Sequence, residues 1–185
     1  LRGSKSIGEI EKRLLSYNKN SPSDIIIGSG WDQNLWKNKA FPNNIFLNRL
    51  FPDKSVLLKR IDGHALLVND YVIKKAGISS KTKVKGGSIL VENNKPTGVL
   101  VDNAMDLVMG ILPPNTSKDI TKALIDAEKK ALENGLTTVD DAGLDKKTIQ
   151  VIDSLQEIGE LKIRVYAMIS NTNDNLNYYL TNGII

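Results

Sequence analysis

The sequence contains no cysteine and only one histidine, His64, among its 185 residues. The absence of cysteine excludes a disulfide framework and a thiolate zinc site, and it leaves the redox compartment undetermined. One histidine cannot complete a hydrolytic zinc centre, which takes about three or four protein ligands, several of them usually histidines. We therefore expect this chain by itself to bind no metal tightly and to hydrolyse nothing.

Several other signals are missing. No apolar run approaches the roughly 20 residues of a membrane span, so no membrane partner is expected. The 25 lysines and arginines exceed the 21 aspartates and glutamates, but they are scattered along the chain, which argues against nucleic-acid binding. The sequence has no Gly-x-Ser-x-Gly elbow, and its "GSG" lacks the Gly-Lys-Ser/Thr ending of a phosphate loop. Serine-hydrolase and nucleotide-binding functions are thereby disfavoured.

The ends of the chain also lack expected features. The sequence begins "LRGSKSIGEI", without an initiator methionine or a leader, and it stops at "YYLTNGII". We expect a segment of a longer protein, and the compartment, cytoplasmic or periplasmic, stays open.

What is present is an apolar fraction of 41%, enough for one sizeable core or for a core and a smaller lobe. The first hundred residues predict a mixed α+β arrangement. Its expected elements are a helix over 7–17 capped by Ser4 or Ser6, strands over 25–27 and 55–62, a helix over 65–77, a hairpin turning at Asn93 and Asn94, and a helix before the proline pair at 113–114.

From residue 117 onward the pattern becomes regular. A capped amphipathic helix over 117–135 precedes a strand near 136–143, a helix over 146–158, a strand over 161–170 and a helix near 173–180. Helices and strands that alternate with short loops favour right-handed βαβ units and a parallel sheet. We therefore divide the chain into a first helix at 1–19, an α+β lobe at 20–112 and a βα segment at 113–185.

The stretch "RIDGHALLVND" places His64 after Asp62 and a glycine, at the start of the expected helix. Taken alone, His64 is either a structural residue or a side chain that contacts substrate. Arg60 has two interpretations as well, a salt bridge with Asp62 or a pair with a substrate carboxylate.

Two further stretches carry candidate residues. In "GSGWDQNLW", Trp31 and Trp36 either fill a gap between lobes, or Trp31 forms a pocket wall while Asp32 fixes a loop. In "TTVDDAG", Asp140 and Asp141 are expected at the carboxyl end of a strand, where active sites of parallel α/β folds lie. Side chains alternate along a strand, so only one of the two carboxylates can face a cleft there.

Five motifs together resemble the metal-dependent amidohydrolase superfamily, and more narrowly the branch of N-substituted formamide deformylases. They are "GSGWDQNLW", "FPDKSVLLKRIDGHALLVND", "GGSILVENNKPTGVLVDNAMDLV", "GLTTVDDAG" and "LKIRVYAMIS". The resemblance implies a partial TIM-like barrel of two parallel strands with their helices, preceded by an inserted α+β lobe. It implies hydrolysis of an amide or amide-like C–N bond by a metal-activated water, with zinc as the expected metal.

The resemblance also assigns roles. Residues 1–19 would follow the first barrel strand, and the metal ligands would lie outside this chain. His64 and Asp141 would be catalytic, and Trp31, Asp32, Arg60 and Asp62 would contact a small amide substrate. Asp140 departs from the family, in which many members carry histidine there, so its role is in doubt.

One alternative function stays open, and the sequence also predicts a property of the incomplete barrel. A non-catalytic α/β binding or interaction module is the alternative function. Because an incomplete barrel leaves strand edges uncovered, we also expect one of two outcomes. Either the chain self-associates into a homo-oligomer through residues 137–139 and 163–168, or the βα segment is the less protected part in hydrogen exchange.

Overall fold

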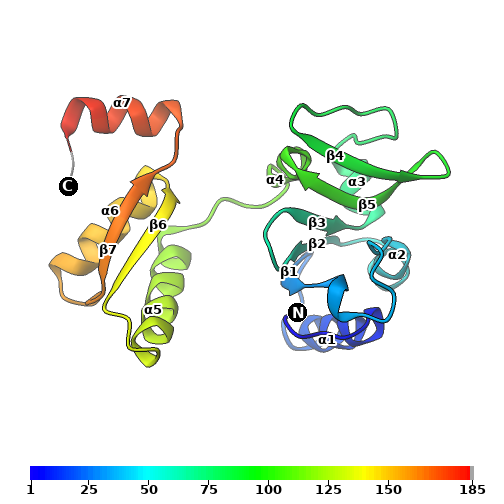
Figure 1. Cartoon of the computed structure of the whole chain (residues 1–185), viewed down its shortest axis with the longest axis horizontal. Coiled ribbons are helices and arrows are strands. Elements are labelled where there is room, and N and C mark those ends of the chain that lie inside the picture. Colours follow the sequence, from blue (N-terminus) through cyan, green and yellow to red (C-terminus); the bar gives the residue numbers. More distant parts are fainter. Residues whose placement is uncertain (184–185) are drawn as a thin grey trace. The chain divides into compact units, whose positions relative to one another are not determined.

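The structure, a computed structural model, describes residues 1–183 and has a mixed α/β fold in two compact units (Figure 1). Unit 1 is Leu1–Pro113, and unit 2 begins at Pro114. Neither proline of the junction can donate a backbone hydrogen bond, so the local sequence ends regular structure where the two units separate. No helix within residues 1–183 combines the length and the apolar character that crossing a membrane requires.

Unit 1 is built on a five-stranded sheet. Along the sheet the order is β1 (Ile25–Trp31), β2 (Ser55–Arg60), β3 (Ala65–Val68), β5 (Lys95–Asp102) and β4 (Gly87–Glu92). β1 and β2 are parallel, and every other neighbouring pair is antiparallel. The predicted hairpin is confirmed as β4 and β5, and its turn residues Asn93 and Asn94 both have positive φ.

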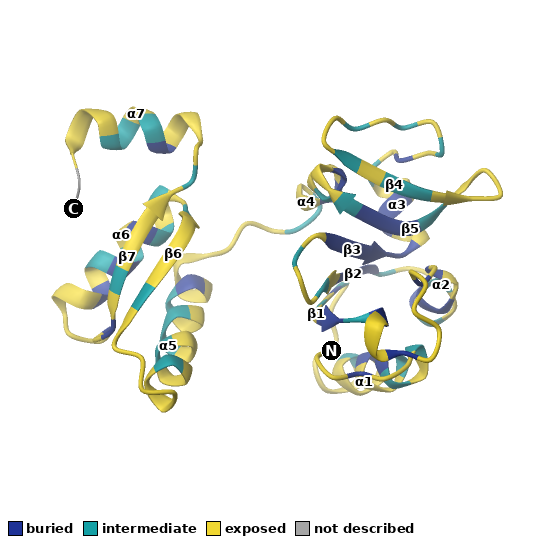
Figure 2. Ribbon diagram, viewed as in Figure 1, coloured by how far each residue is buried: buried dark blue, intermediate teal, exposed yellow. Residues whose placement is uncertain are grey.

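Helices cover both faces of this sheet (Figure 2). The first core cluster receives Ile10 and Leu14 from α1 (Ile7–Asn20) and Phe46 and Leu47 from α2 (Ile45–Leu50). The second receives Val72 and Ile73 from α3 (Asp70–Lys75) and Val108 from α4 (Asp106–Met109). The first helix, capped by Ser6 as predicted, therefore packs as part of unit 1.

The burial of both sheet faces explains one wrong prediction. Residues 65–77 were expected to form one helix, but Ala65–Val68 is strand β3 and only Asp70–Lys75 is helical. Leu67 packs in the first core cluster and Leu66 in the second, because successive side chains point to opposite faces. A strand that is buried on both faces has a continuous apolar sequence, which also suits a helix.

Gly98 marks a close approach of backbones within unit 1. Its φ is +92°, and a Cβ there would lie 2.4 Å from the carbonyl oxygen of Val68 and 2.6 Å from Cβ of Asn44. We expect Gly98→Ala to lower the free energy of unfolding by about 2 kcal/mol or more, through strain and overlap together. Urea denaturation measures this. Gly110→Ala is the control, since its φ is not positive and no atom lies within 4 Å, and an equal loss in both variants would contradict the prediction.

Unit 2 has a two-stranded parallel sheet. Its elements are α5 (Ser117–Glu133), β6 (Thr138–Leu144), α6 (Lys146–Glu157), β7 (Arg164–Ile169) and α7 (Asn173–Asn182). They agree closely with the predicted ranges, although Thr116 rather than Ser117 caps α5. A core of Ile152, Leu155, Leu161 and Ile163 forms with partly buried residues of α5, β6 and β7. The βαβ unit is thus present, and a TIM-like barrel remains a proposal.

A buried asparagine fixes the last helix of unit 2. Asn175 is 1% exposed, and its Nδ2 donates to the carbonyl oxygens of Leu144 at 3.0 Å and Ser170 at 2.8 Å. Its Oδ1 accepts the amide of Lys146 at 2.9 Å. Because Leu144 ends β6 and Ser170 follows β7, one side chain joins both strands to α7.

A capping box begins α5. The amide of Asp119 donates to Oγ1 of Thr116 at 3.2 Å, and the Thr116 amide donates to Oδ2 of Asp119 at 2.9 Å. Hydrogen bonds from the Thr116 hydroxyl, and then from its amide, lower the pKa of Asp119. A carboxyl group with a lowered folded-state pKa stabilises the fold above its unfolded-state pKa. This stabilisation is lost as the pH falls through the folded-state value.

We therefore expect Asp119→Asn to remove part of the acid sensitivity of unit 2. The stability difference between wild type and variant should be largest near neutral pH and should shrink below about pH 4, where aspartates ordinarily become protonated. Thermal unfolding of both proteins across this range measures it. A difference that does not change with pH would contradict this origin.

Candidate active-site residues

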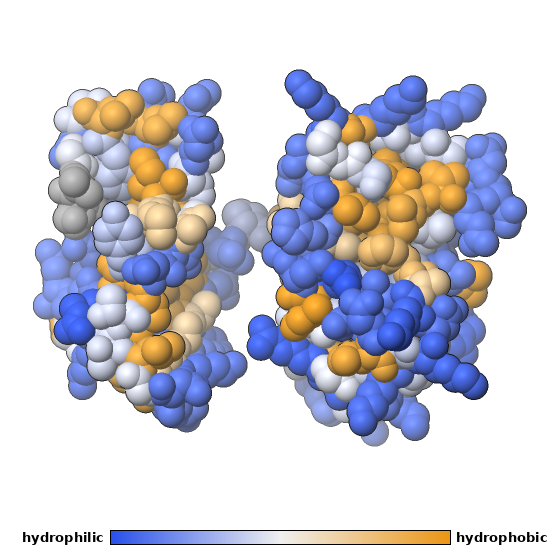
Figure 3. Space-filling view, viewed as in Figure 1, coloured by the Kyte–Doolittle hydropathy of each residue, from blue (hydrophilic) through white to orange (hydrophobic). Residues whose placement is uncertain are grey.

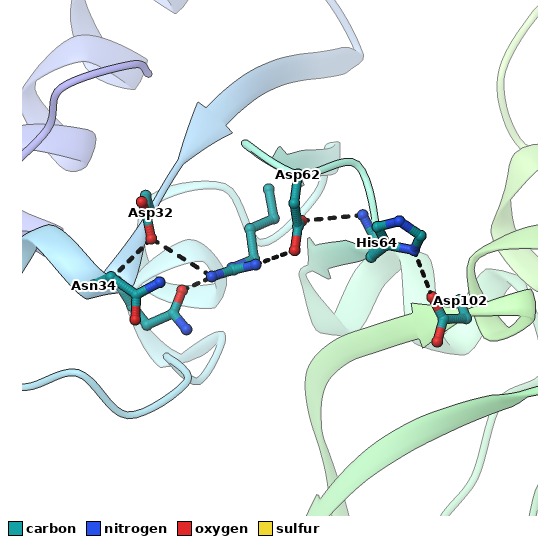
Figure 4. A network of polar contacts seen from close by, with 7 residues as sticks. Asp32, Asn34, Asp62, His64 and Asp102 are labelled. Atoms are coloured by element: carbon teal, nitrogen blue, oxygen red, sulfur yellow. Dashed lines mark hydrogen bonds and ion pairs between the residues drawn. The ribbon is translucent and has the colours of Figure 1, made fainter.

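Four of the residues singled out in the sequence lie together at one edge of the unit 1 sheet (Figure 4). We call Asp32, Gln33, Arg60, Asp62, His64 and Asp102 the Arg60 cluster. Asp32 follows β1 and Arg60 ends β2, and the parallel register pairs Trp31 with Arg60. Because parallel strands bring their carboxyl ends to the same edge, these side chains meet although they are far apart in the sequence.

All three guanidinium nitrogens of Arg60 have partners within the chain. Nε donates to Oε1 of Gln33 at 2.8 Å, Nη2 lies 3.5 Å from Oδ1 of Asp32, and Nη1 pairs with Oδ2 of Asp62. The guanidinium carbon also lies 5.9 Å from the centre of the Phe41 ring. Of the two interpretations of Arg60, this structure contains the salt bridge with Asp62. A substrate carboxylate would have to displace one of these partners.

Asp32 fixes a loop, as its sequence position suggests. Its Oδ1 accepts the amide of Asn34 at 3.0 Å and so caps the short 3-10 helix η1 (Gln33–Leu35). The same oxygen pairs with Arg60, and through it the start of η1 is joined to the end of β2. In this structure Asp32 therefore fixes the position of η1 relative to the end of β2.

His64 lies in the turn between β2 and β3, and not at the start of a helix as expected. Its amide donates to Oδ1 of Asp62 at 3.1 Å. Its ring Nδ1 lies 2.9 Å from Oδ1 of Asp102, while 74% of the side chain is exposed. Asp102, at the end of β5, was not singled out in the sequence, where it lies 38 positions after His64.

The expectation that Trp31 forms a pocket wall needs correction for this chain. The residue is 0% exposed, its Nε1 donates to the carbonyl oxygen of Leu58 at 2.7 Å, and its ring centre lies 6.2 Å from that of Trp36. No part of the indole is open to a substrate in unit 1. Both tryptophans belong to the core of this unit.

Asp141 belongs to unit 2, whereas all residues of the Arg60 cluster belong to unit 1. The strand β6 continues to Leu144, so Asp140 and Asp141 lie within the strand and not at its end as expected. Asp140 is opposite Tyr166, and Asp141 is opposite Ala167. By alternation, Asp141 shares a face with Val139, which packs against the unit 2 core, and Asp140 lies on the other face. Both residues are exposed.

The resemblance seen in the sequence implies a divalent metal, and the described residues can be tested for a site. Within residues 1–183, no three histidine, cysteine, aspartate or glutamate side chains gather closely enough to hold a metal ion. The carboxylates of the Arg60 cluster are instead paired with Arg60 and His64. The donor set described in this chain does not fit a metal centre.

Comparison with known proteins agrees with the sequence motifs. YtcJ of Bacillus subtilis (strain 168), described as an amidohydrolase, is 40% identical over 117 residues, which are 62% of this chain and 22% of that protein. LONG AFTER FAR-RED 3 of Arabidopsis thaliana is 37% identical over 120 residues, 64% of this chain and 20% of that protein. The chain therefore spans about a fifth of the length of these curated relatives.

Solved structures share the fold. An uncharacterized metal-dependent hydrolase from Pyrococcus horikoshii OT3 matches all of this chain with a TM-score of 0.64 and 24% identity, over 35% of that structure. A second, from Pyrococcus furiosus, matches 91% of this chain with a TM-score of 0.57 and 25% identity, over 33% of its own chain. The sequence model of the amidohydrolase family matches residues 2–181. This chain therefore belongs to the amidohydrolase family.

Proposed function

We propose that this chain is part of a metal-dependent amidohydrolase that hydrolyses an amide or amide-like C–N bond. The observation that carries the proposal is the family match, which extends over residues 2–181. The matching structures are described as metal-dependent hydrolases. Since this chain spans only part of its relatives and its described residues do not fit a metal centre, we place the metal ligands in the rest of the protein.

Within this function, the Arg60 cluster would form part of the pocket mouth. Arg60 is 14% exposed and pairs with Asp32 and Asp62, so it holds the end of β1 and the β2–β3 turn together. His64 is the most exposed member of the cluster, and its Nε2 has no described partner. We assign substrate contact and proton transfer to His64, and to Asp32, Arg60 and Asp62 the shape and charge of the mouth.

Three finer assignments rest on the sequence resemblance. Asp141 remains our second candidate catalytic residue, zinc the expected metal, and an N-substituted formamide the first substrate to test.

The exposed Tyr166, Met168 and Ile169 of β7 contribute to the apolar surface of unit 2, and Figure 3 shows apolar surface on both units. A homo-oligomer through this surface remains part of the proposal.

The test begins with the complete coding sequence, expressed and purified as the full-length protein. Its metal content is measured by mass spectrometry, and hydrolysis is assayed with N-benzylformamide, N-benzylacetamide and the ester phenyl acetate. We expect bound divalent metal and amide hydrolysis that a chelator abolishes and added Zn²⁺ restores. Cleavage of the ester alone would contradict the C–N bond assignment. Absence of both metal and turnover would favour a non-catalytic binding module.

A further inference from the structure

His64 and Asp102 face each other across two neighbouring strands. The register of β3 and β5 pairs Ala65 with Val101, which places the residues just beyond this pair opposite each other. The amide of Asp102 donates to the carbonyl oxygen of His64 at 3.0 Å. The His64 Nδ1 and the Asp102 Oδ1 are 2.9 Å apart (Figure 4). The two residues are thus joined through both their backbones and their side chains.

The backbone of Asp102 has a conformation that favours glycine. Its φ is 50° and its ψ is −128°, a combination that residues with a Cβ rarely adopt. The backbones are close together here, since a Cβ on Gly87, the residue paired with Asp102, would lie 2.3 Å from the amide nitrogen of Ala104. Glycine would adopt this φ and ψ with less strain, yet the residue is an aspartate, and its carboxylate forms the contact with His64.

Hydrogen bonds, and not packing, orient the imidazole. The side chain is 74% exposed, so packing against neighbouring side chains restricts it little. Asp62 accepts a hydrogen bond from the backbone amide of His64, and the described hydrogen bond of the ring is the one with Asp102. An ionised carboxylate can only accept a hydrogen bond, so Nδ1 must be the donor to Asp102. In the neutral ring the lone pair then resides on Nε2.

We propose that Asp102 is a positioning residue that keeps His64 in the Nδ1–H tautomer and leaves Nε2 free to accept a proton from substrate or water. The proton acceptor role rests on the proposed function. The tautomer does not, because it depends only on contacts within unit 1. We call the tautomer of His64 the structural step and proton transfer at Nε2 the catalytic step, and each can be tested without the other.

The structural step can be measured on this chain by ¹⁵N NMR, because His64 is its only histidine and gives one pair of ring signals. At about pH 9 the ring of an ordinary histidine is neutral, since its pKa is about 6.5. We expect a protonated Nδ1 and an unprotonated Nε2 in the wild type. In Asp102→Ala the two signals should exchange character, because a free neutral imidazole prefers the Nε2–H tautomer.

Two further variants separate positioning from a general structural role. Asp62→Asn removes a nearby charge but keeps an oxygen for the His64 amide, so the Nδ1–H tautomer should persist. Asp102→Gly relieves the unfavourable φ, so it should unfold at a higher temperature than Asp102→Ala while losing the Nδ1–H tautomer. An Nε2–H tautomer in the wild type, or an unchanged tautomer in Asp102→Gly, would overturn the proposal.

The catalytic step is measured in the full-length protein with N-benzylformamide. We expect Asp102→Ala to lower kcat about tenfold with little change in KM, since the role proposed for Asp102 is to orient His64 and not to bind substrate. A normal kcat in a variant whose tautomer has changed would overturn the catalytic step. If the full-length wild type hydrolyses no amide, the proposed function fails, whereas the tautomer result still decides the structural step.

Discussion

Replacing His64 by alanine in the full-length protein is expected to lower turnover about tenfold or more while leaving the metal content unchanged. The exposed ring, held by Asp102 at 2.9 Å, would transfer a proton without being a metal ligand. Steady-state kinetics with N-benzylformamide and elemental analysis of the same preparation measure the two quantities.

His64→Asn sharpens this test. The asparagine Nδ2 can donate to Asp102 as the Nδ1–H does, but no group replaces Nε2, so we expect a loss of turnover as large as in His64→Ala. Lys81→Ala, an exposed substitution elsewhere in unit 1, is the control and should retain wild-type turnover. Loss of metal from either His64 variant would make His64 a ligand, and unchanged kinetics would make it a structural residue.

The largest effect on stability is expected at Trp31. Trp31→Ala should lower the free energy of unfolding of unit 1 by about 3–5 kcal/mol, the range for truncating a buried tryptophan. The residue is 0% exposed, it donates to the Leu58 carbonyl oxygen, and it makes an edge contact with Phe41 at 6.3 Å between ring centres. The substitution leaves a cavity and removes the hydrogen bond to the Leu58 carbonyl oxygen.

Urea denaturation followed by the fluorescence of the remaining Trp36 measures this loss. Leu35→Ala lies in the same segment but replaces a residue that is 53% exposed, so it should change stability by less than about 1 kcal/mol. Trp31→Phe keeps an aromatic ring without the indole N–H, and should fall between these two. An equal loss for Trp31→Ala and Leu35→Ala would mean that the indole is not part of the core.

Unit 2 could be predicted well from the sequence because its signals are local. The apolar residues of α6 recur at helical spacing, as Ile149, Ile152 and Leu155 do, and Asp145 is a favourable cap. Unit 1 was harder. The run from Ala65 to Val68 is buried on both faces, which removes the alternation that identifies a strand, and only pairing with β2 and β5 decides its structure.

Part of the candidate site could be predicted from the sequence, and part of it depends on how the strands pair. Arg60, Asp62 and His64 are close in the sequence, and they could be grouped without a structure. Asp32 joins them through the parallel pairing of β1 with β2, which the sequence does not specify. Asp102 depends on the register of β3 with β5 and on a backbone conformation that an aspartate seldom adopts, so no sequence pattern indicated it.

The parallel pairing of β1 with β2 also has a consequence for the order of folding. Closing a long loop costs more chain entropy than closing a short one, so the β4–β5 hairpin, whose Glu92 pairs with Lys95, should form early. β1 pairs across the sequence with β2, Ile25 with Ser55, and should dock late at the edge of the sheet. Since Asp32 follows directly on β1, Arg60 would gain its last partners only in the final steps of folding.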